Sequence, residues 1–145
     1  AIDRRTLREY LTSQLAPSAT PSQSLNTTIG AVATNLRLSK AECTKFASVA
    51  HDGLARAVRP AHLMNDGDTV FALSVGHGDL VVSENEPIFN DPIGRPALLN
   101  KVLATGADMF GQACTEAILQ ATSAGRMLSY RDLCPSAFRD LTDDV

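Results

Sequence analysis

The chain has few cysteines, no long apolar run and little net charge, and each shortage excludes a class of protein. Its 145 residues include three cysteines without a C-x-x-C pair. An odd, unpaired set argues against a disulfide framework and a zinc site, and predicts reduced thiols in a cytoplasmic protein. The sequence has no apolar run long enough for a membrane span, and its charged start is unlike a signal peptide. A formal charge of −3 gives no basic footprint for nucleic acid or an acidic membrane.

Apolar spacing and turn residues predict an alternation of helices and strands. After a first helix, the stretch "APSATPSQS" is typical of a surface linker, and residues 79–96 are typical of a polar loop. The predicted elements are helices at Thr6–Leu15, Ser39–Arg59 and Ala97–Thr122, and strands at Thr28–Ala33 and Thr69–Val75. The order strand, helix, strand, helix indicates an α/β or layered α+β domain.

The helix that follows Ser39 has the clearest internal signals. Ser39 is expected to be its N-cap and Glu42 stands at the capping-box position. Phe46 and Leu54 mark an apolar face that we expect to pack on a sheet. Within the later helix, Met109 and Phe110 are expected in the core. Three helical glycines predict close approach of a neighbouring element: Gly53, Gly106 and Gly111.

The segment "NDGD" places two carboxylates around a glycine, at Asp66 and Asp68. By itself it predicts a turn, which leads into a buried strand at Thr69–Val75. If the strand began earlier, both carboxylates would face one side, and their repulsion would raise the pKa of one of them. The segment lacks the spaced oxygen ligands of a calcium loop, so we expect no metal.

Histidines and arginines of the central region have simpler interpretations. The spacing of His51, His62 and His77 fits no zinc motif, and we place all three outside the catalytic set. Arg56 is expected to pair with Asp52 on the helix surface.

Several separate motifs resemble one known family. The runs "NTTIGAVATN", "AHDGLARAVRPAH", "DGDTVFAL" and "YRDL" occur in that order between Leu25 and Phe138. Together they resemble the small-subunit region of the DmpA-like aminopeptidases, a family that includes L-aminopeptidase/D-esterases, β-peptidyl aminopeptidases and nylon-oligomer hydrolases. The resemblance implies an α+β fold that forms part of a four-layer αββα sandwich.

The resemblance also implies a self-cleaving precursor. In the nylon-hydrolase branch the cut falls between Asn and Thr, which corresponds here to Asn26 and Thr27. Thr27 would then be the N-terminal nucleophile, with Asp66 and Asp68 as its acidic partners and no cofactor. Residues 1–26 would be the end of an upstream subunit region or a linker, and residues 27–145 the small subunit region.

The chemistry suits a threonine that becomes N-terminal. A hydroxyl is a weak nucleophile until a base takes its proton, and a terminal α-amine, with a pKa near ~8, can be that base. The amine exists only after the bond to Asn26 is cut. For a threonine considered alone, an ordinary position in a strand is the simpler interpretation.

Two other functions stay open. The chain could be a noncatalytic α/β interaction fragment of the same fold, or an acyltransferase of a related self-cleaving fold. The family's larger subunit has no counterpart here, so we expect a larger upstream partner from the same precursor and an oligomer of processed heterodimers. The expected substrate is a small peptide or amide. The Val82–Pro96 loop is longer than the family leads us to expect.

Overall fold

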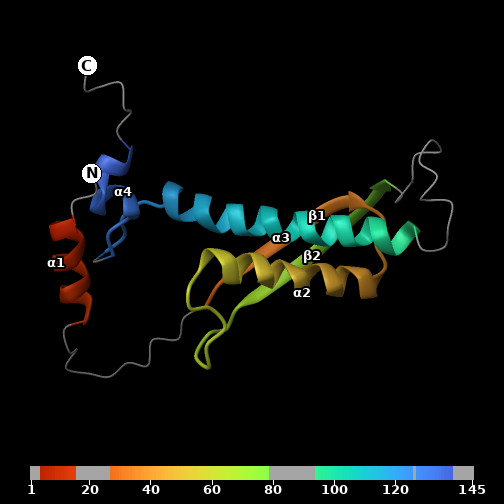
Figure 1. Ribbon diagram of the computed structural model, residues 1–145, viewed down its shortest axis with the longest axis horizontal. Coiled ribbons are helices and arrows are strands. Elements are labelled where there is room, and N and C mark those ends of the chain that lie inside the picture. Colours follow the sequence, from red (N-terminus) through yellow and green to blue (C-terminus); the bar gives the residue numbers. More distant parts are fainter. Residues whose placement is uncertain (1–3, 16–26, 79–93, 126, 139–145) are drawn as a thin grey trace, which may run out of the picture. The chain divides into compact units, whose positions relative to one another are not determined.

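The computed structural model describes residues 4–15, 27–78, 94–125 and 127–138. Its elements, in chain order, are α1 (Arg4–Leu15), β1 (Ile29–Leu36), α2 (Lys40–Ala57), β2 (Thr69–Gly78), α3 (Gly94–Gln120), α4 (Tyr130–Leu133) and the 3-10 helix η2 (Pro135–Phe138) (Figure 1). Helices combined with strands confirm the α+β class. Among the described helices, none has the length and hydropathy needed to cross a membrane.

The chain divides into two compact units. One unit is Ser24–Cys114, and it holds both strands, α2 and most of α3. The other combines Ala1–Gln23 with Thr115–Val145. In this second unit the amide of Leu128 donates a hydrogen bond to the Tyr10 hydroxyl, at 3.3 Å.

Strands β1 and β2 are parallel neighbours, and within the described residues they make up the sheet. The register pairs Ile29 with Thr69 and continues to Thr34 and Ser74. Helix α2 connects the two strands, as parallel pairing requires a crossover. Both strands occur where the sequence predicts them, but β1 begins one residue later and extends to Leu36, and β2 extends to Gly78.

The two faces of the sheet differ in burial. Val32 and Val70 point to the helix side and are buried. On the opposite side, Ile29 and Phe71 are 72% and 58% exposed, and Leu73 and Val75 are also exposed. The prediction that β2 is a buried strand is therefore correct for one face only, and the described residues leave the other face open and apolar.

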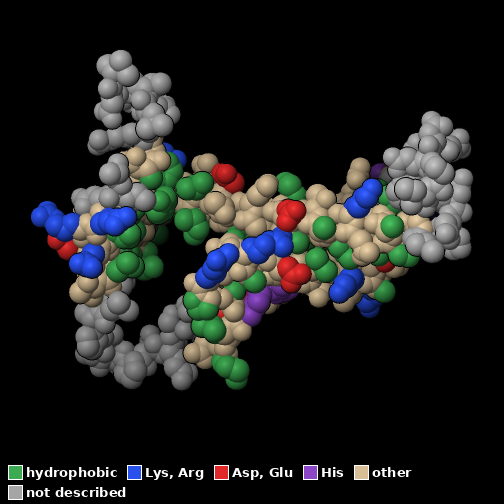
Figure 2. Space-filling view, in the orientation of Figure 1, with side chains coloured by type: hydrophobic (Ala, Val, Ile, Leu, Met, Phe, Trp, Pro, Cys, Tyr) green, Lys and Arg blue, Asp and Glu red, His purple; other side chains and the backbone are tan. Residues whose placement is uncertain are grey.

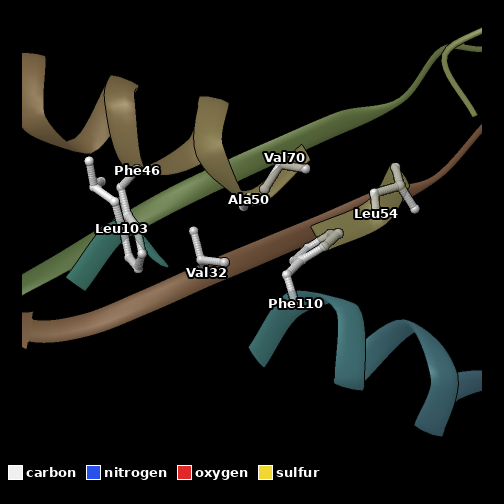
Figure 3. Close-up of a cluster of buried hydrophobic side chains, with 7 residues drawn as sticks. All are labelled: Val32, Phe46, Ala50, Leu54, Val70, Leu103 and Phe110. Carbon is white, nitrogen blue, oxygen red and sulfur yellow. The ribbon is translucent and has the colours of Figure 1, made fainter. Parts of the chain in front are cut away.

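Helices α2 and α3 both cover the same face of the sheet (Figure 1). The core between them consists of Val32, Phe46, Ala50, Leu54, Val70, Leu103 and Phe110 (Figure 3). Phe46 and Leu54 confirm the apolar face predicted for α2. Burying side chains of this size stabilises the fold by about 1.5–3 kcal/mol each.

Glycines allow the close packing of α2, α3 and β1. A Cβ atom on Gly53 would collide with the backbone carbonyl of Ala107, and one on Gly106 would collide with the Phe46 ring. A Cβ on Gly30 would come within 2.5 Å of the Phe110 ring. The predicted close packing at the helical glycines is confirmed, because each lacks a side chain where a neighbour occupies its space.

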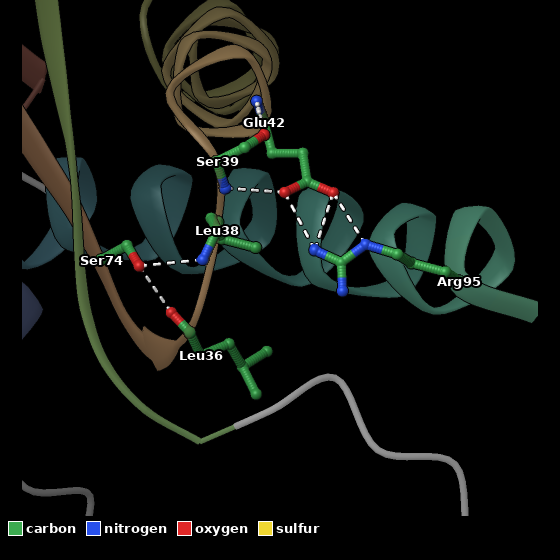
Figure 4. Close-up of polar contacts among 6 residues, drawn as sticks. All are labelled: Leu36, Leu38, Ser39, Glu42, Ser74 and Arg95. Atoms are coloured by element: carbon green, nitrogen blue, oxygen red, sulfur yellow. Dashed lines mark hydrogen bonds and ion pairs between the residues drawn. The ribbon is translucent and has the colours of Figure 1, made fainter.

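The start of α2 is held by a capping box and by an ion pair to α3 (Figure 4). The Ser39 amide donates to Glu42 Oε2 at 2.7 Å, and the Glu42 amide donates to Ser39 Oγ at 3.3 Å. Arg95 at the start of α3 donates to both carboxylate oxygens of Glu42. The hydrogen bond from the Ser39 amide lowers the pKa of Glu42 most, and the hydrogen bond from Arg95 lowers it further. The predicted cap is confirmed.

A hydroxyl group bridges the irregular end of β1. The register shifts between Thr34 and Leu36. There, Ser74 Oγ donates to the Leu36 carbonyl at 2.6 Å and accepts from the Leu38 amide at 3.0 Å (Figure 4). These backbone groups are thereby satisfied where the ladder is interrupted.

Three sequence-based expectations about the helices are wrong. Helix α3 begins at Gly94 instead of Ala97. Pro96 fits within its first turn, because the backbone amides there have no partner in the helix and the missing amide of proline is no loss. Met109 is 57% exposed rather than in the core. Arg56 pairs with Asp108 of α3 at 2.7 Å, so this ion pair links two helices rather than two turns of one helix.

Lys, Arg, Asp and Glu side chains are interspersed along α2 and α3 (Figure 2).

Candidate functional site

The entrances of β1 and β2 bring two distant segments together. Ile29 and Thr69 are paired at the start of a parallel ladder. Because parallel strands start at the same edge of a sheet, the residues just before each strand are neighbours. The pair that precedes β1 is Thr27 and Thr28, and the segment that precedes β2 is Asp66, Gly67 and Asp68.

The backbone of Thr28 is fixed from both sides by the β2 segment. Its amide donates to Asp68 Oδ1 at 2.9 Å. Its carbonyl accepts a hydrogen bond from the Thr69 amide at 2.8 Å. Thr27 directly precedes this fixed peptide and is exposed to solvent. Thr27 is thus an exposed residue beside one whose amide and carbonyl are both hydrogen-bonded.

The Thr27 hydroxyl lies against the turn at Gly67. A Cβ atom on Gly67 would come within 2.6 Å of Thr27 Oγ1 and 3.6 Å of its Cβ. Real Cβ atoms essentially never come closer than 3.0 Å to such an atom, so a side chain at Gly67 would force a shift. Glycine at this position therefore leaves the space that the Thr27 hydroxyl occupies.

Asp68 is the carboxylate that hydrogen-bonds to the segment just before β1. Its side chain is only 8% exposed, and its Oδ2 lies 2.8 Å from His62 Nδ1. Burial, the largest single influence, raises its pKa, but hydrogen bonds from Thr28 and His62 together outweigh burial and the pKa of Asp68 is lowered. An ionised carboxylate only accepts hydrogen bonds, so Nδ1 of His62 carries the proton. The raised pKa expected from paired carboxylates is not what Asp68 shows.

Asp66 has a different environment. Its Oδ2 accepts from the Leu63 amide at 2.6 Å, while its own amide donates to the Leu63 carbonyl at 2.9 Å. These bonds close the turn Leu63–Asp66, which directly precedes Gly67. Strand β2 begins at Thr69, so both aspartates precede the strand instead of lying along one of its faces.

His62 is a member of the site that the sequence reasoning missed. Its backbone has a φ of 60°, a left-handed conformation uncommon for a residue with a side chain. Its ring lies 4.9 Å from that of His51 on α2, measured between centroids. The three histidines have no metal-ligand spacing, and an imidazole that donates across a turn to a carboxylate has no characteristic spacing in the sequence. His77 is exposed near the far end of β2.

Some predicted positions lie outside the described residues. Asn26, the residue before the predicted cut, is one of them. The predicted Val82–Pro96 loop lies outside as well, except for its last residues, which belong to α3. The four-layer sandwich likewise stays a prediction.

Comparisons with known proteins agree with the resemblance. The sequence profile of peptidase family S58 matches residues 2–129. An uncharacterized aminopeptidase of Mycobacterium leprae is 40% identical over 94% of this chain and 38% of its own length. An uncharacterized aminopeptidase of Mycobacterium tuberculosis is 41% identical over 88% of this chain and 36% of its own length. A 6-aminohexanoate-oligomer endohydrolase of a Kocuria species is 40% identical over 50% of this chain and 20% of its own length.

These matches confirm the resemblance to the DmpA-like family and its group of aminopeptidases and nylon-oligomer hydrolases. The same matches give the share of each relative that this chain covers. The chain spans little more than a third of the aminopeptidases that it matches.

Proposed function

The chain belongs to peptidase family S58, and on this premise we propose that it is the nucleophile-bearing part of a self-processing amide hydrolase. The observation that carries the proposal is the placement of Thr27. Its hydroxyl lies against Gly67, directly before a peptide that Asp68 and Thr69 hold. Accurate placement of a nucleophile is itself a large part of catalysis.

Self-cleavage would use the Thr27 hydroxyl on the preceding peptide bond. Oγ1 attacks the Asn26 carbonyl carbon, the C–N bond breaks, and the freed nitrogen takes the proton that the hydroxyl loses. An ester then joins Asn26 to Thr27. Water hydrolyses this ester, which leaves a carboxylate on Asn26 and a free amine and hydroxyl on Thr27.

Substrate hydrolysis would use the same oxygen after cleavage. The new α-amine accepts the hydroxyl proton, directly or through one water, and Oγ1 of Thr27 attacks the substrate carbonyl. The substrate C–N bond breaks and its amine leaves with the proton. Water then hydrolyses the acyl ester and restores the hydroxyl.

Both aspartates belong to the proposed site, in different roles. Asp68 accepts from the Thr28 amide and so fixes the peptide that follows the nucleophile. Asp66 closes the turn directly before Gly67, the residue that lies against Thr27. The donors that stabilise the developing oxyanion would come mainly from the remaining part of the enzyme.

The remaining part of the enzyme would also cover the open face of the sheet. Ile29, Phe71, Leu73 and Val75 form a contiguous apolar surface on two paired strands. A surface of this kind marks a packing or interaction site. A second sheet from the rest of the protein, packed on this face, would complete the four-layer sandwich.

The substrate class follows from the relatives' names. Those relatives are aminopeptidases and hydrolases of 6-aminohexanoate oligomers. Both act on amide bonds, so we propose N-terminal residues of peptides, amino-acid amides or ω-amino-acid oligomers as substrates, with no cofactor.

Intact-mass spectrometry on variants of the full-length protein tests the proposal. Thr27→Ala should remain one uncut chain without amidase activity, because it lacks the hydroxyl. Thr27→Ser should retain part of both functions, and Thr28→Ala, the neighbouring control, should still be cut. Normal cleavage of Thr27→Ala would rule out Thr27, and an uncut wild-type protein would favour a noncatalytic interaction fragment.

A further inference from the structure

His62 combines a side-chain hydrogen bond, a ring contact and a left-handed backbone. Its Nδ1 donates to Asp68, its ring lies against His51, and its backbone is in the left-handed region. The left-handed conformation is costly for a residue with a side chain, and such conformations persist where surrounding contacts fix them. Here the fixed group is an imidazole aimed at a carboxylate.

The contacts form a continuous path to the nucleophile. His62 contacts Oδ2 of Asp68, and the other oxygen of that carboxylate accepts from the Thr28 amide. The Thr28 amide belongs to the same peptide unit as the Thr27 carbonyl. A rotation of the Asp68 side chain therefore either moves the peptide unit between Thr27 and Thr28 or breaks its hydrogen bond to Asp68.

The carboxylate needs both donors to hold its orientation. Asp68 is mostly buried, so a lost donor leaves a charged oxygen poorly satisfied, and the side chain would turn to find another partner. The His51 ring on α2 packs beside the His62 ring, at 4.9 Å between centroids, and limits its motion. Helix α2 is in turn anchored in the core through Leu54 and Phe46.

We propose that His62 is a positioning residue for the nucleophile, which acts through Asp68 and the Thr28 amide to hold Thr27 Oγ1 in its reactive place. This role rests on the proposed function of Thr27. His62 needs only a hydrogen-bond donor at the Nδ1 position, and it takes no proton from the substrate.

The test is the rate of self-cleavage of the full-length protein, which requires no external substrate. His62→Asn and His62→Asp are a matched pair of equal size, and both residues tolerate a left-handed backbone. Asn offers an N–H donor near the Nδ1 position, whereas Asp has none and repels Asp68. The control is His77→Asp, which adds the same charge at an exposed position of β2.

The proposal predicts that His62→Asn is cut within about threefold of the wild-type rate, and that His62→Asp is slowed by about tenfold or more. His77→Asp should be cut normally. In the processed enzyme, turnover of alanine p-nitroanilide should show a lower kcat for His62→Asp with little change in KM, because a displaced nucleophile affects the chemical step.

Equal cleavage rates for folded His62→Asp and His62→Asn would overturn the positioning role. If His62→Asp does not fold, His62→Ala replaces it, and a folded Ala variant cut at the wild-type rate is equally decisive against the proposal. An uncut Thr27→Ala beside a normally cut His62→Asp would reject His62 alone. A normally cut Thr27→Ala would reject the nucleophile and the positioning role with it.

Discussion

Gly67 and Thr27 are complementary: the missing side chain of the first is the space that the hydroxyl of the second occupies. They are far apart in the sequence and meet because β1 and β2 are parallel and begin at the same edge. The nucleophile proposed here is thus placed by a turn of another segment as well as by its own strand.

Replacing Gly67 with Ala should disable self-cleavage while the chain still folds. The new Cβ would come within 2.6 Å of Thr27 Oγ1, so the hydroxyl must move. A displacement of about 1 Å is enough to reduce a reaction rate by ~100-fold. Intact mass over time measures the rate. Met64→Ala, three residues earlier and fully exposed, is the control, and a Gly67→Ala variant cut as fast as this control would contradict the proposed geometry.

Asp68 should make stability depend on pH at the acidic end. Its pKa is lowered in the folded protein. A carboxyl with a depressed folded pKa contributes stability above its unfolded pKa and loses it as pH falls through the folded value. The difference in unfolding free energy between wild type and Asp68→Asn should therefore be constant near about pH 7 and shrink below about pH 4. Denaturation at a series of pH values measures it, and a difference that does not change with pH would refute the assignment.

For Gly53→Ala, packing and helix propensity predict changes of opposite sign in the free energy of unfolding. Propensity alone predicts that Gly→Ala inside a helix stabilises by about 1 kcal/mol. The collision of the new Cβ with the Ala107 carbonyl instead predicts a net loss of about 1–3 kcal/mol, because backbone cannot move aside as a flexible side chain can. Thermal and denaturant unfolding measure the change. Ser48→Ala, on the exposed side of α2, should be neutral or slightly stabilising, and stabilisation by Gly53→Ala would show that the helices separate easily.

The open sheet face should tolerate charge poorly in the full-length protein. Leu73 is 50% exposed among the described residues, and burial by the rest of the enzyme would make Leu73→Lys cost about 2 kcal/mol or more. The expected result is a lower melting temperature and loss of the processed pieces' association on gel filtration. Ala55→Lys, on the exposed side of α2, is the matched control. Equal behaviour of the two variants would mean that this face stays in water.

The sequence was most informative where local rules decide the structure. The capping box at Ser39 and Glu42 and the buried stripe of Phe46 and Leu54 follow from short-range spacing, and the structure has both. It was less informative about which face of β2 is covered, since a strand of apolar residues has the same pattern whether one face or two are packed.

Contacts between distant segments explain what the sequence could not predict in the site. The family resemblance implied Thr27 and the aspartates, but the bond of Asp68 to the Thr28 amide depends on strand register. The contact of His62 with Asp68 depends on a left-handed backbone, which histidine adopts more often than most residues but which the residue type alone does not specify. The lowered pKa of Asp68 follows from these same contacts.

The central claim is that Thr27 becomes an N-terminal residue and acts as the nucleophile. The most direct measurement is the intact mass and N-terminal sequence of each chain in a purified preparation of the wild-type, full-length protein. If Thr27 is the nucleophile, the preparation contains two chains, the downstream one beginning "TTIGAVATN" with a free threonine amine. A single uncut chain, or a downstream chain that begins at any other residue, would contradict it.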